Sequence, residues 1–257
     1  MRNDLKGRFV WHELMTSDPD AAGKFYTDVV GWGTQPWEGG DGPYTMWING
    51  EMPVGGVMQL PEEAKAGGAP PHWLPYIGTP DVDATASRGK ELGGKVMVQP
   101  MDIPEIGRFA VVADPQGAVF AAFASDNEPA GADDPKVGEF SWHELITTDY
   151  EAAWDFYSEL FGWEKTDAMD MGEMGVYQMY GQGGTTYGGM FNKTAEMPQP
   201  PSWLCYARVR DVNQAAERIK AKGGSVLNGP MEVPGGDMIV QGMDPQGAAF
   251  ALHHTAS

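Results

Sequence analysis

Two glutamates with matching neighbours are the clearest candidates for acid–base chemistry. Glu13 lies in the sequence FVWHEL and Glu144 in FSWHEL. Alternate side chains of a strand face the same side, so each glutamate shares a face with the tryptophan two residues earlier, Trp11 or Trp142. A carboxylate partly buried beside an indole has a raised pKa, which suits it to act as a general base. The alternative is a carboxylate that hydrogen-bonds a loop amide or a tyrosine and only supports the fold.

The histidines of these segments, His12 and His143, point to the opposite face by the same alternation. We expect them to be structural residues that face the helices or a domain interface. A metal site shared with the adjacent glutamate is the alternative, which the opposed side-chain directions disfavour. Near the C-terminus, His253 is expected to line a second ligand-binding face. Its counterpart is Phe123, so the two faces are predicted to differ chemically.

Aromatic and apolar residues accompany these candidates. Aromatic clefts suit flat or apolar small ligands, whereas plain core packing is the alternative for the same residues. The predicted ligand-binding residues are Trp11, Trp47, Leu74, Tyr76, Phe123, Trp142, Leu204, Tyr206 and His253, and the wider aromatic group adds Tyr44, Trp73, Tyr177 and Trp203. The glycine-rich pieces GGDGP and GQGG lack the strand–helix context of a phosphate loop, so we expect turns there.

The chain consists of two copies of one sequence. Trp11 corresponds to Trp142, a shift of 142 − 11 = 131 residues, and KFYTDVVGW matches DFYSELFGW at the same shift. Near the end of each copy, ADPQGAVFAAF matches MDPQGAAFALH. The intervening SDNEPAGADDPKVGE is rich in acidic residues, proline and alanine, which indicates a linker. We expect domains at 1–125 and 138–257 joined by a linker at 126–137. A fused pair can reproduce a homodimer interface, so we expect a pseudo-dimeric monomer or a homodimer.

Each copy is predicted to contain two βαβββ modules. The first helix is expected from about Asp18 to Val30, with Asp18 as N-cap, Pro19 at the first position and Gly31 as a left-handed stop. Further helices are expected to start near Asp81, Asp149 and Asp211. Strands in the first copy are expected at 8–15, 31–37, 43–49, 53–60, 73–79, 95–99, 107–112 and 118–124. The helices would cover one face of each sheet, and the other face would curl around a cavity.

The composition narrows the classes of partner. The net charge is −19, which opposes binding to nucleic acid or to anionic lipid. Cys205 is the only cysteine, which excludes an intramolecular disulfide and a cysteine-rich zinc site. No stretch is apolar and long enough to cross a bilayer, and the N-terminus does not read as a secretory signal. We therefore expect a cytoplasmic protein that binds a small molecule, with neither a nucleic acid nor a membrane as partner.

Three motifs, in order and twice over, resemble the vicinal oxygen chelate superfamily of glyoxalases, bleomycin-resistance proteins and extradiol dioxygenases. They are a first strand followed by AAGKFYTDVVGW or AAWDFYSELFGW, then DVDA or DVNQA, then DPQGAVF or DPQGAAF. The resemblance covers almost the whole chain. It implies an α+β fold of four βαβββ modules, which form two glyoxalase-like domains with open-barrel clefts. In the metal enzymes of this superfamily, His, Glu or Gln side chains hold one divalent ion in the cleft.

The resemblance places those ligand positions on residues that cannot coordinate a metal. They are Trp11, Leu74 and Ala121 in the first copy, and Trp142, Leu204 and Ala251 in the second. We therefore expect no metal at the family position and no cofactor. The leading hypothesis is a metal-independent small-molecule binder, or a cryptic enzyme that uses Glu13 or Glu144 as general base. The alternatives are a metal-dependent lyase, isomerase or dioxygenase of the lactoylglutathione-lyase kind, and a scaffold without a ligand.

Overall fold

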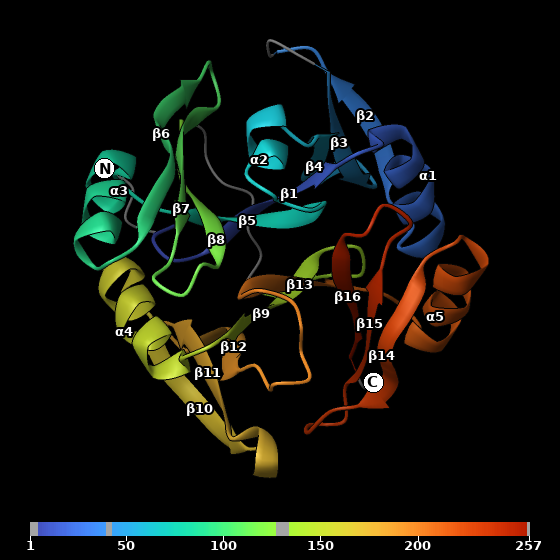
Figure 1. Cartoon of the computed structure of the whole chain (residues 1–257). Coiled ribbons are helices and arrows are strands. Elements are labelled where there is room, and N and C mark those ends of the chain that lie inside the picture. The colour runs from blue at the N-terminus through green and yellow to red at the C-terminus, as the bar shows by residue number, and fades with distance from the viewer. Residues whose placement is uncertain (1–4, 40–42, 127–133, 256–257) are drawn as a thin grey trace. The chain divides into compact units, whose positions relative to one another are not determined.

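The computed structural model describes residues 5–39, 43–126 and 134–255. The described residues form four modules in the predicted βαβββ order (Figure 1). The first copy contains β1 (Phe9–Thr16), α1 (Pro19–Val29), β2 (Gly33–Trp37), β3 (Tyr44–Asn49), β4 (Met52–Gln59), α2 (Glu62–Ala66), β5 (His72–Gly78), α3 (Val82–Glu91), β6 (Lys95–Ile103), β7 (Gly107–Ala113) and β8 (Val119–Ser125). The second copy contains β9 (Phe140–Thr147), α4 (Tyr150–Phe161), β10 (Glu164–Asp170), η1 (Gly172–Met174), β11 (Val176–Gln182), β12 (Thr185–Asn192), β13 (Ser202–Arg208), α5 (Val212–Ala221), β14 (Ser225–Glu232), β15 (Met238–Met243) and β16 (Ala249–His254).

The strands make two eight-stranded sheets of the same topology. Their strand orders are β2-β3-β4-β1-β5-β8-β7-β6 and β10-β11-β12-β9-β13-β16-β15-β14. Parallel and antiparallel neighbours are mixed, since β1 runs parallel to β4 while β3 runs antiparallel to it. Neither sheet closes on itself, which confirms the predicted α+β class with open sheets. No helix in the described ranges is long and apolar enough to cross a membrane.

Capping aspartates begin the four main helices, as predicted. Each carboxylate accepts a hydrogen bond from a backbone N–H in the first turn, which satisfies a donor that has no partner inside the helix. The capping residues are Asp18, Asp81, Asp149 and Asp211. At the other end of α4, Gly162 adopts the left-handed conformation with φ of 75°. Of the GQGG piece, Gly183 and Gly184 form the turn between β11 and β12, while Gly181 and Gln182 end β11. In contrast, most of GGDGP and of the predicted linker (40–42 and 127–133) lies outside the described residues.

The compact units do not follow the two copies. Unit 1 comprises Met1–Val10, Pro75–Asp133 and His143–Trp203, and unit 2 comprises Trp11–Leu74, Asp134–Trp142 and Leu204–Ser257. The four modules are numbered in chain order. Unit 1 combines module 2 of the first copy with module 3 of the second copy, and unit 2 combines module 1 of the first copy with module 4 of the second copy. Figure 1 shows the matching helix pairs, α3 beside α4 and α1 beside α5. The predicted boundaries at 125 and 138 thus divide the sequence, whereas each unit contains residues from both copies.

Each unit has its own core, in which a helix of one copy covers strands of the other. In unit 2, Phe25 of α1 packs edge-on against Phe250 of β16, with ring centroids 5.7 Å apart. In unit 1, Phe120 of β8 packs against Tyr157 of α4 at 5.5 Å. Burial of aromatic side chains of this size contributes a large part of the stability of a domain.

A buried polar chain reinforces the junction in each unit. In unit 1, Asp114 of the DPQG motif accepts three backbone N–H groups on one oxygen and the Tyr157 hydroxyl on the other, at 3.1 Å. The Trp203 indole donates to the same hydroxyl oxygen at 3.3 Å. Asp244, Tyr26 and Trp73 repeat this arrangement in unit 2. Burial, and then the nearby aspartate, raise the pKa of both tyrosines, which therefore keep their protons and act as donors.

Candidate functional site

Glu144 is hydrogen-bonded by a tyrosine within unit 1. Its buried side chain lies on β9, where Oε2 accepts the Tyr177 hydroxyl of β11 at 3.0 Å. Gly189 of β12 is the register partner of Glu144. A Cβ on this glycine would lie 2.0 Å from Cε1 of Tyr177, so only glycine leaves room for the ring across the strand. The neighbouring Phe191 ring stacks against Tyr177 at 5.8 Å.

Glu13 has the same surroundings within unit 2. Gly56 is its register partner, and a Cβ there would lie 1.9 Å from the Tyr44 hydroxyl. Trp11 donates its indole N–H to this hydroxyl at 2.9 Å, and the hydroxyl is hydrogen-bonded to Glu13. Burial, followed by the charge of Glu13, raises the pKa of Tyr44. The tyrosine therefore stays protonated and donates to the carboxylate. The hydrogen bond to a tyrosine that we described as the alternative reading is present in both copies.

The second copy contributes an apolar cluster to unit 2. It consists of Leu204, Tyr206 and Ala251, with Trp142 and Ile239 packed against them. Tyr206 is register partner of Ala251, and its hydroxyl accepts a hydrogen bond from the Gln241 amide at 2.7 Å. The α5 side of the same strands is formed instead by Ala207, Val240 and Leu252, which belong to the core. The cluster therefore lies on the sheet face opposite α5.

Three residues of this cluster occupy the positions that the resemblance assigns to metal ligands. Trp142, Leu204 and Ala251 have no side-chain atom that binds a divalent cation, and they pack against one another and their apolar neighbours. The residues present therefore do not fit the metal ion of the superfamily's metal enzymes. In unit 1, Ala121 at the corresponding position is equally unable to coordinate a metal and is buried.

Unit 1 carries an aromatic group on β5, β7 and β8. The ring of Tyr76 lies 6.0 Å from that of Phe123 and 6.3 Å from that of Phe109. Tyr76 is register partner of Ala121. The next residues along the two strands, Ile77 and Ala122, belong to the core on the helix side. The predicted ligand-binding residues Tyr76 and Phe123 are thus neighbours, and both Leu74 and Tyr76 are buried on β5.

Several predicted aromatic wall residues lie in the cores instead. Trp47 is fully buried among α1 residues and donates its indole N–H to the Gly56 carbonyl at 2.9 Å. Trp73 and Trp203 are hydrogen-bonded to the core tyrosines described above. These three tryptophans therefore belong to the cores, and not to the apolar cluster of Trp142 or the aromatic group of Tyr76.

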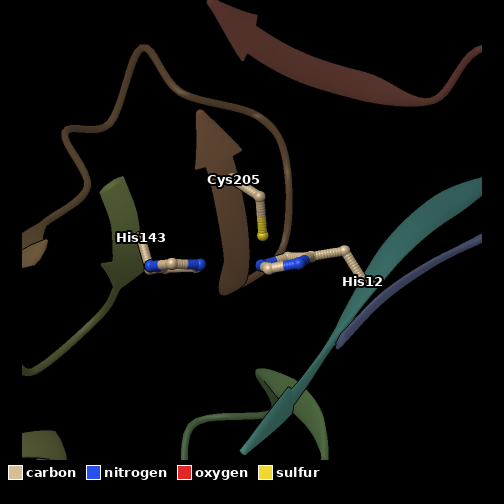
Figure 2. A group of neighbouring side chains, drawn as sticks. All are labelled: His12, His143 and Cys205. Carbon is tan, nitrogen blue, oxygen red and sulfur yellow. The ribbon is translucent and has the colours of Figure 1, made fainter. Parts of the chain in front are cut away.

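Buried histidines and the cysteine are drawn in Figure 2: His12 on β1, His143 on β9 and Cys205 on β13. Within unit 2, His12 stacks on Phe140 at 3.7 Å, and one of its ring nitrogens lies within 4.8 Å of the Cys205 sulfur. Burial raises the pKa of this thiol. Imidazole and thiolate are metal-ligand types. The sequence did not indicate this pairing, because it depends on strand order.

His143 has structural contacts within unit 1. Its ring stacks on Phe9 at 3.6 Å, and its Nδ1 lies 3.2 Å from the Tyr187 carbonyl oxygen. Burial lowers the pKa of His143 to about 3. The imidazole is therefore neutral at physiological pH and packs as a flat aromatic ring.

His253, the predicted ligand residue of the second copy, is part of a polar group within unit 2. One ring nitrogen lies 2.9 Å from the Ser141 hydroxyl and the other lies 2.8 Å from an Asp237 carboxylate oxygen. The sequence comparison identified His253 by its difference from Phe123 but did not identify Ser141 or Asp237, which become neighbours only through the order of β9, β16 and β15.

Comparison with known proteins gives matches over the whole chain. A family model described as "Glyoxalase/Bleomycin resistance protein/Dioxygenase superfamily" matches residues 8–121 and again 139–252. "Putative glyoxylase CFP32" of Mycobacterium tuberculosis (strain CDC 1551 / Oshkosh) is 33% identical over 246 residues, covering 94% of this chain and 92% of the relative. "Anthracycline biosynthesis protein DnrV" of Streptomyces peucetius is 31% identical over 258 residues, covering 96% and 92% respectively.

Solved structures show the same fold at low sequence identity. The Mn(II)-bound glyoxalase from Novosphingobium aromaticivorans superposes with a TM-score of 0.63 at 18% identity, covering 98% of this chain and 83% of that one. The 2,3-dioxygenase LapB from Pseudomonas sp. KL28 superposes with a TM-score of 0.68 at 11% identity, covering 98% and 94%. At such identities the likeness establishes the architecture, while the chemistry depends on the residues of this chain.

Proposed function

Because the chain belongs to the glyoxalase/bleomycin resistance protein/dioxygenase superfamily, we propose that it binds a small molecule without the divalent ion of the superfamily's metal enzymes. One observation carries this proposal. The positions that would hold the ion in the second copy are Trp142, Leu204 and Ala251, which form an apolar cluster with Tyr206. An apolar cluster of this kind offers a ligand packing surface instead of coordination.

The ligand we propose is a flat aromatic compound with a hydroxyl or carbonyl group. The aromatic rings of the Tyr76 group in unit 1 and of the Trp142 cluster in unit 2 favour stacking against such a compound. The Glu13–Tyr44 and Glu144–Tyr177 pairs add polar groups that can fix its orientation. The relative DnrV is named for anthracycline biosynthesis, and anthracyclines are polycyclic aromatic compounds. This name supports the same ligand class.

Recognition through the glutamates is the role that we assign to the two pairs. A carboxylate held by a tyrosine hydroxyl keeps a defined orientation, which makes it an effective acceptor for a ligand hydroxyl. The same geometry permits proton abstraction, so Glu13 and Glu144 are also the candidate general bases of a cryptic enzyme. Binding is the function we propose first, because it needs no further residue.

A binding experiment with and without metal tests the proposal. The purified protein is dialysed against EDTA and titrated with hydroxylated anthraquinones, and the tryptophan fluorescence is followed. We expect saturable quenching whose Kd is the same before chelation, after chelation, and after addition of Mn²⁺, Zn²⁺ or Ni²⁺. Loss of binding on chelation and its return with one of these ions would instead support a metal-dependent lyase, isomerase or dioxygenase. In that case, turnover of a hemithioacetal would indicate a lyase or isomerase, and turnover of a catechol would indicate a dioxygenase.

A further inference from the structure

Three polar side chains of unit 2 form a linear hydrogen-bonded group. Ser141 lies on β9, Asp237 directly precedes β15, and His253 lies on β16. The Ser141 Oγ is 2.9 Å from Nδ1 of His253, and Nε2 of His253 is 2.8 Å from Oδ2 of Asp237. These distances are those of hydrogen bonds between a nucleophile, a base and a carboxylate that orients the base.

A single tautomer of His253 satisfies both bonds. When Nε2 carries the hydrogen, it donates to Asp237, and Nδ1 is left as an acceptor for the Ser141 hydroxyl. The other acceptor near Ser141 Oγ is the Tyr206 carbonyl oxygen at 3.4 Å, which is too long to compete with the 2.9 Å contact. In this tautomer the Ser141 hydroxyl donates to His253, as the removal of its proton requires.

The fold itself does not need this group. In β8 of the first copy, Phe123 stands at the position of His253, as the matching registers Gly78↔Phe123 and Arg208↔His253 show. Similarly, Gly107 stands at the position of Asp237 and Val10 at that of Ser141. The first copy builds the same module with an aromatic group there. A requirement of the βαβββ fold therefore does not explain why the second copy has three linked polar residues.

The surroundings suit an uncharged substrate with a reactive carbonyl. The side chains of His253 and Asp237 are 14% and 29% exposed, so the group is partly accessible to solvent. Ile239, the register partner of His253, belongs to the apolar cluster with Ala251 and Trp142. On the other neighbouring strand, Arg208 is the register partner of His253, and its guanidinium donates to the Thr255 hydroxyl at 2.6 Å and pairs with the Asp134 carboxylate at 3.6 Å.

We propose that Ser141, His253 and Asp237 form a second site that hydrolyses small carboxylic esters with an apolar or aromatic group. The Ser141 oxygen bonds to the ester carbonyl carbon while its proton passes to Nδ1 of His253. The tetrahedral intermediate then loses its alcohol oxygen, which takes that proton, and an acyl-serine remains. Water attacks this acyl group and gives a proton to His253. Cleavage of the bond to Ser141 then returns the proton to the serine, so ester and water become acid and alcohol.

Covalent labelling and hydrolysis kinetics test this proposal on the full chain. With p-nitrophenyl butyrate, we expect an initial burst of about one p-nitrophenolate per chain, because the acyl-serine accumulates. A fluorophosphonate should add once, on the peptide that contains Ser141. Ser141→Ala and His253→Phe, which introduces the residue of the first copy, should lose both the burst and the label. Asp237 acts as a positioning residue, so Asp237→Asn should lower the rate by roughly 10²–10⁴-fold while Asp237→Glu restores part of it.

Matched controls separate chemistry from support of the fold. Ser158 on α4 is half-buried and its hydroxyl donates to the Asp155 carbonyl of its own helix, so Ser158→Ala should keep the full burst and label. Circular dichroism establishes that each variant is folded. A group that only links the strands would lower the thermal midpoint in Ser141→Ala and leave the native protein unlabelled at Ser141. That result, or undiminished hydrolysis in folded Ser141→Ala, overturns the proposal. Ligand binding at the glutamate–tyrosine pairs uses other residues and is measured separately.

Discussion

Glu144 and Glu13 each lie between a tyrosine hydroxyl and a glycine of the neighbouring strand. The tyrosine hydroxyl donates to the carboxylate and so holds it in a defined orientation. At the scale of single residues, substitutions in these pairs can distinguish a ligand-binding role from a purely structural role. The two roles predict different responses to removal of the charge.

The first prediction concerns that charge. For at least one of Glu13→Gln and Glu144→Gln, the affinity for a hydroxylated aromatic ligand should fall by about 1.5–3 kcal/mol, the contribution of a charged hydrogen bond. Isothermal titration measures the affinity, and urea unfolding measures stability in parallel. Tyr150→Phe is the control, since Tyr150 lies on α4 and packs against the unit 1 core. Unchanged affinity in both Gln variants, with lower stability, would assign both residues a purely structural role.

The second prediction concerns the glycines. Gly189→Ala places a methyl group where the Tyr177 ring lies and should destabilise the protein by about 1–3 kcal/mol, because the ring must move. The same change should weaken ligand binding in that copy. Gly23→Ala in α1 is a matched control, since the nearest atom is 3.8 Å from the added Cβ and alanine favours helix. Equal stability of Gly189→Ala and the parent protein would contradict the close approach of Tyr177.

The third prediction uses the pKa of His143. Burial lowers this pKa from its ordinary value of 6.5 to about 3, so the folded protein holds the ring neutral. Between these values the unfolded chain binds the proton and the folded protein does not. Unfolding free energy should therefore fall as the pH drops below about 6.5, by up to about 1.4 kcal/mol per pH unit from this residue. His143→Phe keeps the stacking on Phe9. Its unfolding free energy, measured by urea titration at pH 7.5, 6 and 5, should fall less steeply as the pH drops. Parallel curves for the two proteins would show that His143 is not held neutral.

At the scale of elements, the sequence predicts the order of strands and helices closely. Aspartate caps and following glycines mark the helices, and glycine and proline separate the strands, so the element order is confirmed and most predicted bounds lie within two residues. The short helices α2 (Glu62–Ala66) and η1 (Gly172–Met174) were not predicted, because each is a single turn without an apolar period.

The site is less predictable than the fold, because it depends on pairs of strands. Alternation along β1 and β9 is visible in the sequence, but the partner strand is not. The tyrosine that reaches each glutamate therefore could not be identified, nor could the Ser141–His253 contact. Trp47 illustrates the same limit, since its aromatic character is obvious but only the register of β3 places it in the core.

The fourth prediction tests the polar junction between elements of different copies. Tyr157→Phe removes the hydroxyl that links Asp114 to the Trp203 indole and leaves two buried polar groups without this partner. We expect a loss of about 2–4 kcal/mol in urea unfolding, because each buried polar group left without its partner costs roughly 1–3 kcal/mol. Tyr150→Phe provides the comparison and should change stability by less than about 0.5 kcal/mol. Similar values for the two variants would show that the junction contributes little.

At the scale of the whole molecule, each compact unit takes one module from each copy. Both copies carry the same motifs, so either pairing of modules satisfies the sequence pattern. For this reason the sequence left the pairing open. The strand order joins the two modules of each copy in one sheet, whereas α1 contacts α5 and α3 contacts α4 across the two copies.

The fifth prediction follows from that pairing. A protease site inserted between residues 126 and 134 should allow cleavage into two fragments that still elute together in gel filtration, because each core contains side chains from both. Urea should separate them in one transition with loss of structure. Fragments that separate under native conditions, each with its circular dichroism intact, would show that each copy folds by itself.

The pairing of modules from different copies in each compact unit also has a consequence for biosynthesis. A ribosome delivers the first copy complete while Phe25 and Val29 of α1 still lack Ala215 and Ile219 of α5, and Phe120 of β8 still lacks Tyr157 of α4. The unit 2 core cannot close until Phe250 and Leu252 have left the exit tunnel, and the unit 1 core cannot close until Trp203 has done so. The growing chain therefore carries exposed apolar surface through almost the whole of its synthesis, and chaperones that bind such surface have longer to act on it than on a protein whose domains fold one after the other.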